Sequence, residues 1–276
     1  MTTQAMTATS PIASSLLPRR ASFWNTMASE WVKLTSLRFT YISLGLGLTL
    51  SLATTAIASL AMAATQNEWP ADFDPFTFSM VGNAFALIIY SVFGVMSMSG
   101  EYTSGMIRLT FTATPRRGRV FFAKLVLVSL IVLVFGLITT IGMFLLWQVI
   151  LGAYGMEITT FGDADARRLV IGLGAAMPFF PLIGVALGVL LRSTAGAITT
   201  VLGLLWLPLI VGEVLPMWWR ENVISLLPGT AVDSLTIAHV VDSPTYTDPA
   251  AATVIAATWL AGFIGAAYVA LIRRDA

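Results

Sequence analysis

The chain has 276 residues, of which 57% are hydrophobic and only 11% are charged, whereas soluble domains average roughly 45–50% apolar and about 25% charged residues. This composition predicts a polytopic membrane protein and excludes a disordered chain, a disulfide scaffold and a nucleic-acid-binding protein. The chain contains no cysteine, which excludes thiol chemistry and cysteine-based metal sites, and its net charge of +1 is informative only once the charges are sorted by side of the membrane.

Residues 1–21 are predicted to form a disordered cytoplasmic tail, because they are polar, rich in Thr, Ser and Ala, and lack the apolar segment of a signal peptide. Residues 22–36 predict an amphipathic helix on the inner leaflet, with Glu30 and Lys33 away from its apolar side. Its apolar residues recur at helical spacing, namely Trp24, Met27, Trp31 and Leu34. Two interpretations stay open for this helix: an anchor for the first span or a functional elbow.

Six stretches reach the roughly 20 apolar residues that a membrane-spanning helix needs. We therefore predict an all-α protein with six transmembrane helices, which form one domain over residues 22–276. The predicted spans are about 39–64, 78–99, 125–154, 169–191, 195–215 and 250–272. Their interiors carry no Asp, Glu, Lys, Arg or His, and Glu213, near the end of the fifth, comes closest.

The bias of Lys and Arg between the loops predicts that both termini are cytoplasmic. One side has a net charge of +9 and the other a net charge of −8. The basic residues of the first side are Arg19, Arg20, Lys33, Arg38, Arg108, Arg116, Arg117, Arg119, Lys124, Arg192, Arg273 and Arg274. The other side has three basic residues, Arg167, Arg168 and Arg220, and most of the acids.

The loop after the second span is the most informative segment, because it is too long for a minimal turn. Residues 106–112 predict a short helix after Gly105, and Thr114 with Pro115 predicts the start of another helix that continues into the third span. Such an element suits docking to another protein. The alternative is ordinary positive-inside topology with contact to anionic lipids.

Further along, the fourth span contains Pro178 and Pro181, which predict a kink. Its Gly184 and Gly188 form a small-xxx-small pair that predicts close helix packing. The connection over residues 216–249 contains an apolar segment, 223–229, that is too short to span, so we expect it to re-enter the membrane or to lie along the outer surface.

The sequence offers no catalytic constellation and no metal site. His239 is the single histidine, which excludes two-histidine metal sites, and no phosphate-binding Lys motif or nucleophile elbow is present. The spans lack the midplane ionisable groups typical of ion-coupled carriers. We therefore expect no cofactor in this chain, and any ATPase, with its ATP and Mg²⁺, is a separate polypeptide.

Several segments resemble the small six-span permeases of type-2 ATP-binding-cassette (ABC) exporters, especially actinobacterial ones. They cover about residues 27–275 in the same order, and they are Ser29-Glu30-Trp31-Val32-Lys33-Leu34, Gly100-Glu101-Tyr102 with Gly105-x-Ile107-Arg108-x-Thr110, Pro115-Arg116-Arg117 with Ala123-Lys124, Gly184-Val185-Ala186-Leu187-Gly188, Leu191-Arg192-Ser193-Thr194-Ala195 and Leu227-Pro228-Gly229-Thr230-Ala231.

The resemblance implies half of a transporter in a bacterial plasma membrane. Two permease protomers, identical or different, would pair above two cytoplasmic ABC ATPase subunits, with 106–112 as a coupling helix and 218–240 closing the pathway outside. The implied coupling residues are Glu101, Met106, Ile107, Arg108, Arg116 and Arg117. The implied cargo is a lipid, peptide, antibiotic or other drug-like molecule.

Two other functions fit the same residues. One is a sensor or immunity protein that works with an ATPase but transports nothing, and it shares every feature above. The other is a secondary carrier, which an ion gradient would drive without any ATPase.

Overall fold

The computed structural model of the chain describes residues 22–65, 75–113, 116–156, 159–212, 214–236 and 243–274, and every regular element within these ranges is helical. The predicted tail, residues 1–21, lies outside the described residues, as do Thr114 and Pro115. Six helical segments are long and apolar enough to cross a membrane, which confirms the predicted all-α class and the number of spans.

The spans follow the predicted ranges closely. In chain order they are α2 (Arg38–Ala64), α3 (Asn83–Thr103) after the short helix η3 (Pro75–Met80), α5 (Arg117–Ala153), the pair α6 (Ala164–Ala176) and α7 (Phe179–Leu191), α8 (Thr194–Gly212) and α11 (Pro249–Arg273). At 1.5 Å per residue α5 is about 55 Å long, so it is longer than the roughly 30 Å of a bilayer core and projects beyond it.

The fourth span is divided into two helices. α6 ends at Ala176 and α7 begins at Phe179, so the break falls at Met177 and Pro178. Proline has no N–H to donate and its ring crowds the preceding turn, which is why a helix breaks or bends there. The two halves have different neighbours: α6 packs against α5 and α10, whereas α7 packs mainly against α3 and α11.

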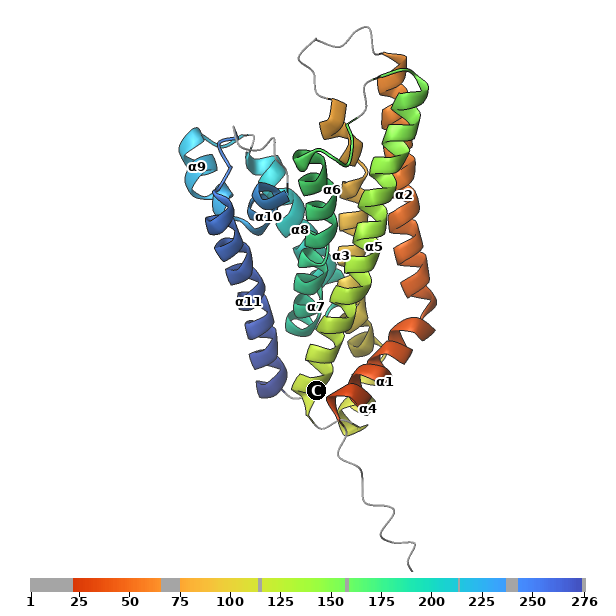
Figure 1. Cartoon of the computed structure of the whole chain (residues 1–276). Helices are drawn as coiled ribbons and strands as arrows, with labels where there is room; N and C mark the ends of the chain where they lie inside the picture. The colour runs from red at the N-terminus through yellow and green to blue at the C-terminus, as the bar shows by residue number, and fades with distance from the viewer. Residues whose placement is uncertain are drawn as a thin grey trace, which may run out of the picture.

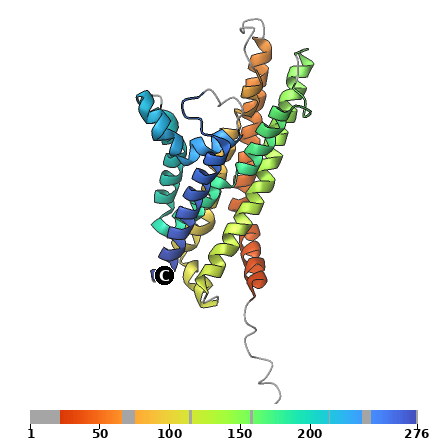
Figure 2. The same ribbon diagram turned by 60° about the vertical axis from the view of Figure 1, so that its left-hand side comes forward.

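The centre of the bundle is the contact between α3 and α7. Gly184 and Gly188 both face α3: a Cβ built on Gly184 would lie 2.9 Å from the Ser91 carbonyl oxygen, and one built on Gly188 would lie 3.2 Å from the backbone nitrogen of Ser99. Without these side chains the two backbones approach closely, as small-xxx-small pairs allow. α2 and α5 run side by side along one edge of the bundle (Figures 1 and 2).

Short helices cover both ends of the bundle. At one end α1 (Phe23–Ser36) crosses beneath the spans beside α4 (Met106–Ala113), and α11 finishes at the same end (Figure 1). At the opposite end lie α9 (Met217–Asn222), η4 (Ile224–Leu226) and α10 (Pro228–Thr236). We call these the α1/α4 end and the α9/α10 end. α10 packs against α6, α8 and α11, so the predicted apolar segment 223–229 forms part of a helical cover.

Candidate coupling site at the α1/α4 end

The face that α1 turns toward the bundle is not the apolar stripe read from its sequence. Thr26, Glu30 and Leu34 are its buried residues, and their spacing of four places them on one face. The side chain of Trp24 is 72% exposed and that of Trp31 is 48% exposed. The two tryptophans therefore lie on the outer side of the helix, where an indole can sit at a membrane interface, while Leu34 and the half-buried Met27 pack against the core.

The turn between α3 and α4 depends on Gly105, whose φ of +70° is a left-handed conformation that glycine adopts without strain. α4 then presents two different sides. Ile107, Thr110 and Phe111 are buried against the bundle. The opposite side carries Met106, Arg108 and Leu109, all of which are exposed. Leu109 is 70% exposed, so α4 offers an apolar surface with one cation at its side.

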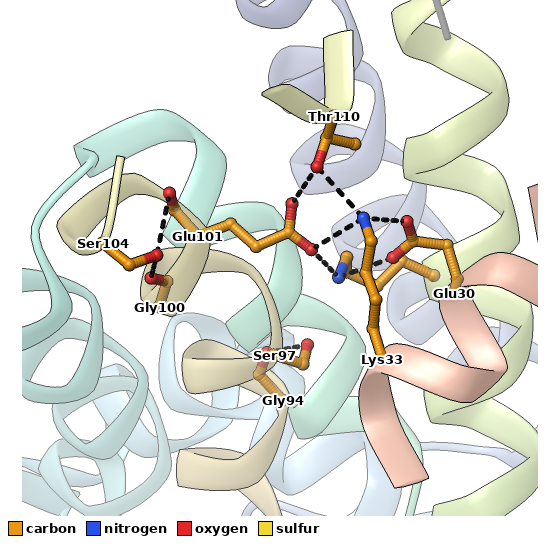
Figure 3. Close-up of polar contacts among 9 residues, drawn as sticks. Glu30, Lys33, Gly94, Ser97, Gly100, Glu101, Ser104 and Thr110 are labelled. Atoms are coloured by element: carbon orange, nitrogen blue, oxygen red, sulfur yellow. Dashed lines mark hydrogen bonds and ion pairs between the residues drawn. The ribbon is translucent and has the colours of Figure 1, made fainter. Parts of the chain in front are cut away.

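Beneath α4, four charged side chains from α1, α3 and α5 form one cluster (Figure 3). The Lys124 ammonium lies 2.9 Å from Glu30 Oε2 and 2.7 Å from Glu101 Oε1. The Lys33 ammonium lies 2.6 Å from Glu30 Oε1 and 3.6 Å from Glu101 Oε1. Each lysine is therefore shared between the two carboxylates, and the cluster connects three helices that are far apart in sequence.

Thr110 attaches α4 to this cluster. Lys33 Nζ donates a hydrogen bond of 3.0 Å to Thr110 Oγ1, which in turn donates to Glu101 Oε2 at 3.3 Å. Figure 3 shows the threonine hydroxyl above Lys33 and the Glu101 carboxylate. Through these contacts α4 is connected to the end of α3, to α1 and, through Lys124, to the start of α5.

The cluster is buried, so each of its charges is stable there only when an opposite charge is beside it. Lys124 and Glu30 are each 1% exposed and Glu101 is 8% exposed. Burial on its own raises the pKa of Glu30, but Lys124 and Lys33 more than offset this effect and hold the pKa below its ordinary value of 4.5. Glu30 is therefore ionised at neutral pH, and removing one member of the cluster leaves its partner with an uncompensated charge in a poorly solvated environment.

Arginines connect the other helices that finish at this end. Arg117 Nη1 donates to the Arg274 carbonyl at 2.8 Å, and its guanidinium lies 5.2 Å from the centre of the Phe111 ring. Arg274 Nη1 donates to the Leu190 carbonyl at 2.9 Å. Arg117 thus joins α4 and α5 to the end of α11, and Arg274 joins α11 to α7.

The six residues assigned to coupling divide between surface and interior. Met106, Arg108 and Arg116 are exposed, Glu101 and Ile107 are buried, and Arg117 is half-buried. The exposed three can touch another protein, whereas the buried residues support α4 from inside. Sequence reasoning assigned no role to Leu109, named Thr110 only as part of a family motif, and did not predict the pairing of Glu30 with Lys124. The signal for the cluster was present, because the chain has only two lysines and both belong to it.

The described residues of the site are arranged for contact between helices. Within the described residues no group of three or more His, Asp or Glu side chains could hold a metal ion, and His239 and Glu213 lie outside those residues. An exposed helix supported by a shared network of ion pairs can instead receive a mechanical input and distribute it among several spans.

Comparison with known proteins agrees with this geometry. A family model described as "ABC-2 family transporter protein" matches residues 26–217, a range that contains the whole ion cluster and α4. No curated protein and no solved structure matches the chain. Because the match covers more than half of the sequence, the chain belongs to the ABC-2 transporter family of multi-pass membrane permeases.

Proposed function

We propose that this chain is the permease subunit of an ATP-driven ABC exporter in a bacterial plasma membrane, powered by a separate ATPase that holds the ATP and Mg²⁺. In this proposal the α1/α4 end faces the cytoplasm. The described basic residues of the positive side, among them Arg38, Arg108 and Arg192, belong to elements that meet at this end, which supports the orientation.

One observation carries the proposal: α4 shows Met106, Arg108 and Leu109 to the outside while Thr110 holds it against the buried cluster. Burying the exposed apolar residues of α4 against a partner protein is favourable. We infer that the ATPase receives this side of α4.

The mechanism is a population shift between two arrangements of the spans. ATP binding closes the ATPases and displaces α4. The displacement reaches α3 through Glu101, α1 through Lys33 and α5 through Lys124. No residue of this chain forms or breaks a covalent bond with the cargo, which we propose to be a lipid, peptide, antibiotic or other drug-like molecule.

The working transporter contains two permease protomers and two ATPases. α11 supports the pairing, because only 17% of its span window is buried within one chain, the smallest share among the six spans. Its large exposed residues include Val254 and Val269. A face of this kind is suited to lipid and to a second protomer.

The test is co-expression with an ABC ATPase, taken from an adjacent reading frame. We expect the pair to co-purify and to hydrolyse ATP, and we expect Met106→Asp with Arg108→Glu to abolish both co-purification and the stimulation of hydrolysis by the permease. The matched control, Met217→Asp with Arg167→Glu, makes the same changes at the α9/α10 end and should leave both intact. Retention of co-purification and stimulated hydrolysis in the α4 variant contradicts the docking assignment.

Flux measurements distinguish an exporter from a sensor or immunity protein and from a secondary carrier. Outward movement of a labelled cargo in vesicles that requires ATP and the ATPase supports an exporter. ATPase association without flux of any tested cargo supports the sensor or immunity function, and flux driven by an ion gradient without the ATPase supports a secondary carrier.

A further inference from the structure

A cavity of about 390 Å³ lies toward the α9/α10 end, remote from the ion cluster. It is lined by η3 with the beginning of α3, by the fourth span, by α8 and by α10, and its wall is mainly apolar. This volume is within the range of about 300–1,000 Å³ that is usual for small-molecule sites. The exposed residues Phe78, Val81 and Trp206 are part of its lining, so the cavity is accessible from outside the bundle.

Asp233 of α10 is the one charged residue among the described residues that line the cavity. Its carboxylate forms no hydrogen bond or ion pair with any described residue. Burial without a partner raises the pKa of Asp233 to about 6, so the group is mainly ionised at neutral pH. An ionised carboxylate in an apolar wall is costly unless a positive group pairs with it, and no described residue forms an ion pair with Asp233.

Arg168, a charged side chain close to Asp233, does not pair with the Asp233 carboxylate. α10 packs against α6, α8 and α11, and from α6 the guanidinium of Arg168 reaches α10. It donates to the Ser234 carbonyl oxygen at 3.3 Å, and no ion pair with Asp233 forms. The carboxylate therefore lines the cavity and accepts no hydrogen bond from any described residue.

A second unused acceptor lines the same cavity. Asn83 Oδ1, at the first residue of α3, is buried and has no hydrogen-bond partner. Two acceptors without donors favour a ligand that supplies N–H groups, and a carboxylate favours a ligand with positive charge. The aromatic rings of Phe78, Phe180 and Trp206 complete the wall, and rings of this kind attract both apolar groups and cations.

We propose that this cavity binds an amphipathic monocation, a protonated amine with an apolar body. The ammonium group pairs with Asp233 and donates to Asn83, and the apolar body packs against Phe180 and the neighbouring rings. Binding of such a cation is a property of the permease alone. The further statement that the cation is the exported substrate rests on the proposed function.

The test uses the full chain in lipid nanodiscs and a fluorescent pair of probes. One probe is a dansyl group joined by a five-carbon chain to a primary amine, and the other carries a hydroxyl in place of the amine. Because a hydrogen bond to a charged group contributes about 1.5–3 kcal/mol, Asp233→Asn should weaken binding of the amine by roughly 10- to 100-fold. The hydroxyl probe should bind wild type and variant equally weakly.

Two further variants keep the test independent of folding. Asp165→Asn removes an exposed carboxylate of α6 and should leave amine binding unchanged. Asp233→Glu retains the charge and should retain most of the affinity. Equal affinity of the amine for wild type and Asp233→Asn, or equal affinity of the two probes for wild type, would overturn the proposal.

The same material distinguishes this inference from the exporter proposal. Binding that depends on Asp233 in a chain that neither recruits nor stimulates an ATPase overturns the exporter and leaves the cation site standing. ATP-driven coupling through α4 with no amine binding at Asp233 overturns the cation site and leaves the exporter standing.

Discussion

The Lys124 ammonium, in the first turns of α5, lies 2.9 Å from a carboxylate oxygen of Glu30 on α1. This contact attaches a surface helix to a membrane-spanning one by charge, although both residues are 1% exposed. Buried pairs of this kind add little net stability compared with apolar residues of the same volume, but they are strongly destabilising when one partner is lost. The contact therefore makes the position of α1 depend on a complete set of charges.

The first prediction follows from that dependence. Lys124→Met leaves Glu30 and Glu101 with only Lys33, and we expect the free energy of unfolding to fall by about 3–5 kcal/mol. The double variant Glu30→Gln with Lys124→Met should recover much of the loss, since Lys33 and Glu101 then balance. Thermal unfolding of the purified chain measures both. Arg108→Met, an exposed change, serves as the control, and a Lys124→Met chain as stable as this control would refute the prediction.

The second prediction concerns pH. Because the pKa of Glu30 is below its ordinary value of 4.5, its ionised form stabilises the folded state above pH 4.5, and this stabilisation is lost as pH falls through the lower, folded-state pKa. The melting temperature of the wild type should therefore drop between pH 5 and pH 3 more steeply than that of Glu30→Gln. Glu221→Gln, which removes an exposed carboxylate, should keep the wild-type slope; identical slopes for all three chains would contradict the prediction.

The third prediction separates the two sides of α4. Leu109→Asp changes a residue that is 70% exposed, so the stability of the permease should change by no more than about 0.5 kcal/mol while ATPase binding weakens by roughly 10-fold or more. Ile107→Ala changes a residue that is 4% exposed and should lower stability by about 2–4 kcal/mol. Thermal unfolding and titration of the ATPase measure the two effects. Unchanged ATPase affinity in Leu109→Asp would show that this side of α4 is not the contact.

The fourth prediction is a pH effect at Asp233, opposite in sign to the one at Glu30. The pKa of Asp233 is raised to about 6, so the folded state favours the neutral acid and loses stability as pH rises from about 4 through 6. Asp233→Asn removes this penalty, and at pH 7.5 it should be more stable than the wild type by roughly 1–3 kcal/mol. At pH 4 the two chains should melt together. A variant that is less stable than the wild type at pH 7.5 would mean that the carboxylate has a stabilising partner.

Much of the fold could be predicted, because a bilayer imposes a length and a composition on every span and those constraints are visible in a single sequence. The break in the fourth span was visible for a similar reason, since Pro178 changes the backbone locally. The burial of the charged residues of α1 was harder to predict from the sequence. On an amphipathic helix Glu30 is expected to face water, and its burial depends on a partner that is distant in sequence, Lys124, as well as on Lys33.

In the site, too, features with a local sequence signal could be predicted and features that depend on tertiary packing could not. The existence of α4 follows from local signals, namely Gly105 before it and the helical residues after it. Which of its sides faces outward depends on how α1 and α3 pack beneath it, so the exposure of Leu109 and the burial of Ile107 could not be derived from neighbouring residues. The cavity at Asp233 is still less local, because four segments of the chain contribute to its wall.

The break between α6 and α7 has a consequence for how the molecule can move. Met177, at the break itself, and Phe180, just after it, both line the cavity, while α7 is bound to α3 and α6 to α5. A hinge at this break would therefore have the cavity at its pivot. Under the proposed coupling mechanism, displacement of α3 at the α1/α4 end would change the angle between the two half-helices and, with it, the shape of the cavity toward the opposite end.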